Sequence, residues 1–126
     1  PARLMLLLLP PSETKRDGGP GPALALDALS HASLTGARRV VLDALTELMR
    51  DEAGAARALT LGAKAVEAEL ARNRAVTSSP TMPAIERYTG VLYDALGVQD
   101  WGADARARAS RHLAVHSALF GLLAAD

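Results

Sequence analysis

The fold class is indicated by the N-terminal stretch Arg3-Leu4-Met5-Leu6-Leu7-Leu8-Leu9-Pro10-Pro11, in which six consecutive apolar residues end at a proline pair. A run of this length is typical of a strand that is covered on both faces of a sheet. The run is shorter than the apolar region of a signal peptide, roughly 7–15 residues, and much shorter than a membrane span of about 20. We therefore predict a buried β-strand at about Leu4–Leu9 and no membrane association.

The composition indicates one folded cytoplasmic domain. Of the 126 residues, 49% are hydrophobic, which is enough to form a core. The absence of cysteine excludes disulfides, thiolate metal sites and cysteine nucleophiles, and it fits a reducing cytoplasm. Because the formal net charge is zero, any binding to nucleic acid must depend on local basic patches.

The rest of the chain is predicted to be mainly helical, so the fold class is α/β and predominantly helical, with a few buried strands. The strongest pattern is Ala37–Met49, whose apolar residues recur at i, i+3, i+4 and i+7 behind a cap at Thr35. Arg38 and Arg39 are interpreted as part of its solvated face. A second buried strand is predicted near Leu113–Ser117, close to the first. The remaining predicted helices are Asp51–Ala58, Ala63–Arg74, Pro83–Tyr88, Val91–Leu96 and a last one from a cap at Asp100 to about His112.

Three segments carry a resemblance to a known family. The first is the apolar strand with Pro10-Pro11-Ser12-Glu13-Thr14-Lys15, and the second is Tyr88-Thr89-Gly90-Val91-Leu92-Tyr93-Asp94-Ala95-Leu96. The third is His112-Leu113-Ala114-Val115-His116-Ser117-Ala118-Leu119-Phe120-Gly121-Leu122-Leu123. In this order and at these distances they resemble the YaaA family of peroxide-stress proteins, and the resemblance spans essentially the whole chain.

The resemblance implies a role in resistance to hydrogen peroxide through limiting free intracellular iron, together with DNA binding through a helix-hairpin-helix element. The family pattern continues past the position of Asp126 with a comparable length of α/β structure. We therefore expect residues 1–126 to form a single incomplete domain, the N-terminal half of a YaaA-like domain. We also expect an exposed apolar patch or sheet edge that supports self-association, and weak function in this chain alone.

The candidate helix-hairpin-helix element is residues 51–74. Such elements present backbone N–H groups of a short hairpin to DNA phosphates, without reading the base sequence. Thr60 stands where the usual hairpin has its first glycine, and two glutamates in the second helix dilute the positive charge. A plain helical hairpin with a glycine turn is the alternative. The residues predicted to contact DNA are Gly62, Lys64, Arg72 and Arg74.

The alternative function is an enzyme or a small-molecule binding protein with a nucleoside-like ligand. We predict that the loop after the first strand, the glycine-tyrosine segment and the second strand converge on one cleft, where Gly90 lets the backbone approach closely. The competing interpretation is that Tyr93 simply packs and Lys15 is exposed. No pair of carboxylates is indicated as an acid and a base, no standard nucleotide motif is present, and no cofactor is predicted, so the sequence favours a non-enzyme. The cleft residues would be Ser12, Lys15, Tyr88, Gly90, Tyr93 and Ser117.

Two further groups are interpreted without a binding role. His112 and His116 are four residues apart, and in a strand that spacing spans about 13 Å, too far for one metal ion. We expect packed or hydrogen-bonded histidines and no metal site. Arg106, Arg108 and Arg111 lie on the last predicted helix, where Arg108 and Arg111 share a face that we expect to be solvated.

Overall fold

The computed structural model describes residues 5–126, so Leu4 of the first predicted strand lies outside the described residues. The described part is mixed α/β, with six α-helices and one three-stranded sheet, which confirms the predicted fold class. The sheet has the order β1 (Leu7–Leu9), β2 (Leu113–Ser117) and β3 (Gly121–Ala124). β1 is parallel to β2 and β3 is antiparallel to it. The second strand has its predicted bounds and lies beside the first, whereas β3 was not predicted.

Three helices pack around this sheet and form with it the sheet body: α4 (Ala84–Arg87), α5 (Val91–Leu96) and α6 (Ala103–His112). α5 has its predicted bounds, and α6 begins later than expected because a short 3-10 turn, Val98–Asp100, precedes it. The centre of the body is Val115 on β2, which is fully buried. Around it lie the other members of one hydrophobic core, Ile85, Tyr88, Tyr93, Val98, Ala109 and Ala125.

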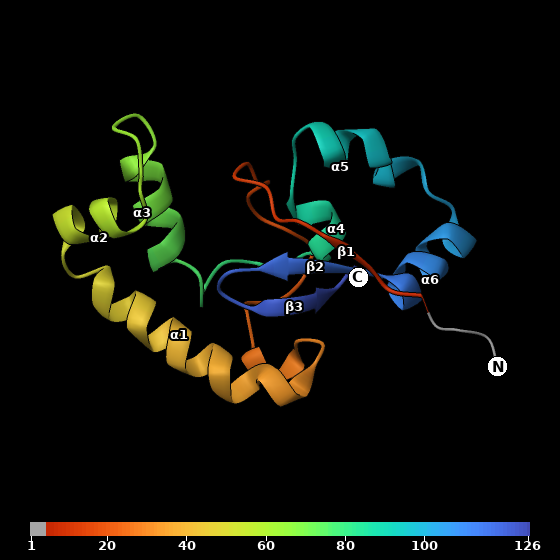
Figure 1. Ribbon diagram of the computed structural model, residues 1–126, viewed down its shortest axis with the longest axis horizontal. Coiled ribbons are helices and arrows are strands. Elements are labelled where there is room, and N and C mark those ends of the chain that lie inside the picture. Colours follow the sequence, from red (N-terminus) through yellow and green to blue (C-terminus); the bar gives the residue numbers. More distant parts are fainter. Residues whose placement is uncertain (1–4) are drawn as a thin grey trace.

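The remaining helices form a helical arm that extends from one side of the sheet body (Figure 1). The arm consists of α1 (Thr35–Leu48), α2 (Glu52–Ala58) and α3 (Val66–Arg74). Two 3-10 turns, Leu26–Ala28 and Ala32–Leu34, lead into α1. The arm has a second hydrophobic core of its own, whose buried members are Met49, Ala55 and Leu70.

The solvated position predicted for Arg38 is wrong. Arg38 is 2% exposed, and its guanidinium donates hydrogen bonds to the carbonyl oxygens of Phe120 (Nε, 2.7 Å) and Leu122 (Nη2, 2.8 Å). The helical spacing explains this, since Arg38 lies four residues before buried Leu42 and shares its inner face. Arg39 is on the outer face as expected, where it pairs with Asp27 at 3.6 Å.

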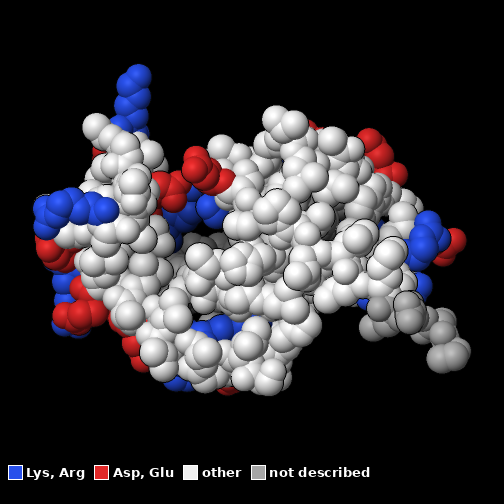
Figure 2. Space-filling view, in the orientation of Figure 1, with Lys and Arg blue, Asp and Glu red and all other residues white. Residues whose placement is uncertain are grey.

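The burial predicted for the first strand is also wrong for Met5 to Leu8, whereas Leu9 is half-buried and packs against the core. Met5, Leu6, Leu7 and Leu8 are 61%, 47%, 48% and 60% exposed. In the described part of the chain β1 pairs with β2 alone, so one edge of β1 and much of its side-chain surface face solvent. The expected exposed apolar edge is therefore present, and Figure 2 shows a largely uncharged surface over the sheet body. No helix among residues 5–126 has the length and apolar character needed to cross a membrane.

Candidate functional site

The loop that follows β1 crosses the segment between α4 and α5. Lys15 and Tyr88 form an isolated antiparallel bridge. Next to it, the backbone N–H of Thr89 donates to the carbonyl oxygen of Thr14 (3.1 Å), and the hydroxyl of Thr14 donates back to the carbonyl oxygen of Thr89 (3.1 Å). This pairing brings the polar residues after the first strand against the glycine-tyrosine segment, which is 75 residues away along the chain.

Two tyrosines form the centre of this junction. The ring centroids of Tyr88 and Tyr93 are 5.4 Å apart. The Tyr93 hydroxyl donates to the carbonyl oxygen of Pro10 (2.6 Å), and the Ser117 side chain lies close enough to the Tyr88 hydroxyl to lower its pKa. The Lys15 ammonium lies 5.7 Å from the centroid of the Tyr88 ring, within range of a cation–π interaction. We call Lys15, Tyr88, Tyr93 and Ser117 the tyrosine cluster.

The protonation of the two phenols follows from their surroundings. Burial raises the pKa of Tyr93 to about 12, with a further contribution from Tyr88. Burial also raises the pKa of Tyr88, against the opposing effects of the Ser117 side chain and of Arg87. Both phenols are therefore protonated at neutral pH, and the Tyr93 phenol donates the hydrogen bond that ties α5 to the end of β1.

Gly90 is half-buried beside the cluster. Its φ of 107° and ψ of −179° belong to a region that residues with a side chain rarely adopt. A Cβ atom here would lie 3.3 Å from Ser12 Oγ and 3.5 Å from Thr14 Oγ1, which is a tight fit. The structure thus brings together the six residues predicted for the cleft. Tyr88, Tyr93 and Ser117 are buried, whereas Ser12, Lys15 and Gly90 are half-buried.

The candidate hairpin is the connection between α2 and α3. Asp51 caps α2 by accepting a hydrogen bond from the backbone N–H of Gly54 (3.0 Å). Thr60 has a φ of 54°, so it adopts the left-handed conformation that the usual glycine would adopt at this place. α3 begins at Val66, three residues later than predicted, because a turn that Gly62 closes with Ala65 (2.9 Å) precedes it.

The four residues predicted to contact DNA are not gathered in one patch. Gly62 and Lys64 are exposed before the first turn of α3, whereas Arg72 and Arg74 lie in its last turn. Nine helical residues span about 13 Å, which separates the two pairs. Both arginines are engaged within the chain: Arg72 pairs with Asp17 and Glu69, and Arg74 pairs with Glu52. Their role in DNA contact remains a prediction.

The histidines and the basic residues of α6 lie apart from these sites. The ring Nδ1 of His112 is 2.9 Å from the carbonyl oxygen of Met5, while His116 is exposed on β2. Among residues 5–126 no three or more His, Asp or Glu side chains are placed to hold one metal ion. Arg106 pairs with Glu86 (2.6 Å), which fixes α6 against α4.

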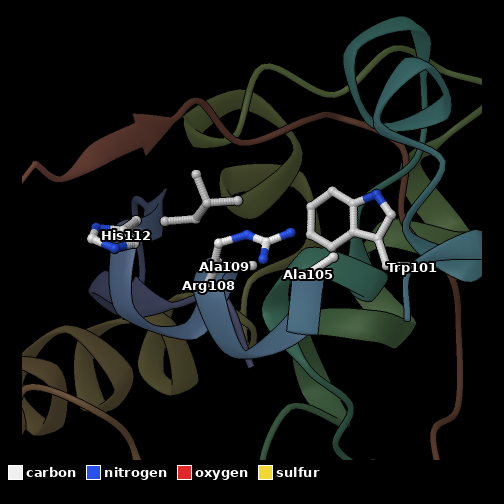
Figure 3. Close-up of a pocket in the computed structure, with 6 residues that line it drawn as sticks. Trp101, Ala105, Arg108, Ala109 and His112 are labelled. Carbon is white, nitrogen blue, oxygen red and sulfur yellow. The ribbon is translucent and has the colours of Figure 1, made fainter. Parts of the chain in front are cut away.

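Sequence reasoning missed a shallow pocket of about 220 Å³ beside α6 (Figure 3). Its polar groups are Arg108 and His112, which are one helical turn apart, and the indole of Trp101 forms one end. Only the i, i+4 spacing of Arg108 and His112 signals it, because Trp101 reaches the pocket from outside the helix. Its lining is Trp101, Ala105, Arg108, Ala109, His112 and Leu113.

The fold and these clusters define a mixed α/β protein in which a tyrosine-centred junction orders the sheet body and basic residues lie on a helical arm. Residues 5–126 match the family model described as peroxide stress protein YaaA, so the chain belongs to this family. The predicted resemblance is confirmed.

Three curated relatives are similar to the chain over almost its whole length. A UPF0246 protein of Corynebacterium glutamicum is 48% identical over 119 residues, which cover 94% of this chain and 46% of the relative. A UPF0246 protein of Streptomyces coelicolor is 43% identical over 117 residues, 93% of this chain and 45% of the relative. A UPF0246 protein of Corynebacterium efficiens is 43% identical over 121 residues, which cover 96% of this chain and 46% of the relative. The chain therefore spans about half the length of the curated relatives that it matches.

Proposed function

We propose that this protein acts in the cytoplasmic response to peroxide stress by contacting the DNA backbone through the hairpin between α2 and α3, an activity linked to limiting free intracellular iron. Family membership supports the peroxide-stress part of the proposal. The observation that carries the DNA contact is the left-handed Thr60, because it gives this connection a backbone turn that is otherwise typical of glycine.

The chemistry of the hairpin suits a phosphate group. A Cβ atom built at Gly62 meets no atom within 4 Å, so a phosphate can approach the backbone there. Lys64 is exposed two residues later and supplies an ammonium group. Figure 2 shows a basic side chain projecting from this end of the arm. Glu67 and Glu69 lie in the first turn of α3 and oppose an anion, so we expect weak, sequence-independent and strongly salt-dependent binding.

The proposal is tested by measuring the affinity for a labelled duplex over a series of salt concentrations. Lys64→Gln removes one phosphate contact, so the slope of log affinity against log salt should fall by about one, with equal weakening for different duplex sequences. Lys15→Gln is the matched control, since it removes the same charge from the tyrosine cluster. An unchanged slope for Lys64→Gln, or a smaller slope for Lys15→Gln alone, would contradict the hairpin contact.

A second candidate function is favoured by the gathering of the predicted cleft residues. Ser12, Lys15 and Gly90 are half-buried beside the buried tyrosines, and the Ser12 hydroxyl lies next to Gly90. A hydroxyl and an ammonium group in one cluster suit the sugar and phosphate of a nucleoside-like ligand. In this case adenosine monophosphate should shift the backbone amide resonances of Thr14, Lys15 and Gly90, and Lys15→Gln should abolish the shifts while Lys64→Gln leaves them unchanged.

A further inference from the structure

Arg72 joins the helical arm to the sheet body through a carboxylate from a distant loop. Its Nε and Nη2 atoms contact Asp17 Oδ1 at 3.1 and 3.0 Å, and its Nη1 contacts Glu69 on its own helix. Asp17 belongs to the loop after β1 and is 55 residues away along the chain. Its side chain is 81% exposed, whereas that of Arg72 is 31% exposed. The half-buried guanidinium of Arg72 is therefore paired with a carboxylate, that of Asp17, which is largely exposed to solvent.

A second guanidinium lies close to this pair. Burial lowers the pKa of Arg87, Asp17 opposes that effect, and Arg72 adds to it, so the three charges act on one another. Arg87 is held in place by hydrogen bonds to the carbonyl oxygens of Arg16 (2.6 Å) and Pro80 (2.9 Å). Figure 2 shows basic side chains in the hollow between the arm and the body, with acidic side chains beside them. Removing Asp17 would leave the Arg72 guanidinium paired with Glu69 alone and would remove the carboxylate that offsets the repulsion between Arg72 and Arg87.

We propose that Asp17 is an internal competitor that occupies the place of a phosphate group on Arg72 and is displaced when the protein contacts DNA. The inference rests on the proposed DNA contact and gives it a regulatory element. A carboxylate and a phosphate both accept the paired N–H groups of a guanidinium, so they compete for the same atoms. An ion pair with an exposed carboxylate contributes little net stability, so replacing Asp17 by a phosphate group on Arg72 costs little free energy. The exchange also releases the arm from the loop after β1.

The test compares Asp17→Asn with Asp27→Asn. Asp27 is a matched control because its side chain is 82% exposed and it also pairs with an arginine, Arg39 at 3.6 Å. Both variants remove one negative charge, so they change the overall attraction to DNA equally. Asp17→Asn should raise the affinity for a labelled duplex by about two- to five-fold relative to Asp27→Asn, and the gain should vanish in an Arg72→Gln background. Equal and measurable affinities for the two variants would overturn the proposal.

A second probe separates this inference from the proposed function. Inorganic phosphate is titrated into each variant while the side-chain Nε–H resonance of Arg72 is followed by NMR. A larger phosphate-induced shift in Asp17→Asn than in Asp27→Asn supports the competition, even if no variant binds duplex. The absence of duplex binding would refute only the proposed DNA contact. Equal shifts overturn the competition, whatever the duplex affinity. Duplex binding that depends on Lys64 but not on Asp17 would leave the proposed function standing and reject the competitor.

Discussion

The sheet body and the helical arm differ in how they are held together. The body has a hydrophobic core of seven buried residues around Val115, whereas the arm has three buried residues in a core that shares none of them. Polar contacts connect the two regions: the Arg38 guanidinium binds carbonyl groups of the β2–β3 hairpin, the backbone N–H of Ala124 donates to Ser30 (2.7 Å), and Asp17 pairs with Arg72. We therefore expect the arm to open more readily than the body.

The largest expected effect is loss of the arm's core. Leu70 is 3% exposed, and Leu70→Ala should cost about 3 kcal/mol of arm stability. Hydrogen exchange should accelerate at amides of α1 to α3 and stay unchanged in β2. The control is Leu92→Ala, which truncates a leucine that is 40% exposed and should have little effect. Equal acceleration in both regions would mean that the arm and the body unfold as one unit.

The polar connection is tested next. Arg38→Met keeps the unbranched apolar stem of the side chain but leaves the carbonyl groups of Phe120 and Leu122 without their donor, at a cost of about 2–3 kcal/mol. Urea unfolding should show the loss of stability. Arg39→Met on the exposed face is the control and should change stability by less than about 0.5 kcal/mol. A neutral Arg38→Met variant would show that the arm is attached by other contacts.

A smaller effect concerns pH and should be confined to the body. The folded pKa of Tyr93 is raised to about 12, above the ordinary value of 10.0, so the unfolded chain loses this proton first. The stability that depends on the protonated phenol is complete below pH 10 and is lost as the pH rises toward 12, by roughly 1–2 kcal/mol. Urea unfolding at pH 9 and pH 11 measures the loss. Tyr93→Phe should reduce it, and an undiminished loss in that variant would assign it to other groups.

The smallest effect concerns the exposed strand. We expect weak self-association through the unpaired edge of β1, because its leucines and its backbone groups face solvent. Replacing Leu6 and Leu8 with lysine should lower the concentration-dependent association seen by sedimentation velocity. Val40→Lys on the arm, at a valine that is 70% exposed, is the control. Association that persists in the double variant would assign it to another surface.

Local sequence patterns predicted where helices and strands form, but they predicted less well which side chains are buried. β2 and α5 have the bounds that an apolar stretch and flanking glycines indicated, because those signals lie in or directly beside the elements. The exposure of β1 and the burial of Arg38 depend on which distant segments lie beside them, and a local pattern carries no such information. β3 was missed because Gly121 and the apolar residues after it extend an already apolar stretch without a clear break.

The candidate sites show the same limit. The six cleft residues come from three segments whose order resembles a family, and the structure brings these segments together around Tyr88. The contact between Asp17 and Arg72 had no signal in the sequence, since the two residues are 55 positions apart and belong to unrelated local patterns. Arg72 was predicted from its charge and its place in the hairpin, and its pairing with Asp17 became visible only in the folded chain.

The central claim is that DNA is contacted by the arm and not by the tyrosine cluster. Hydrogen exchange of the chain with and without duplex DNA at low salt tests it directly, because both regions are measured in one experiment. We predict slower exchange at residues 59–65 and at the end of α3, with unchanged exchange at residues 12–15 and 88–93. Protection confined to residues 12–15 and 88–93 would contradict the claim and assign nucleic-acid binding to the sheet body.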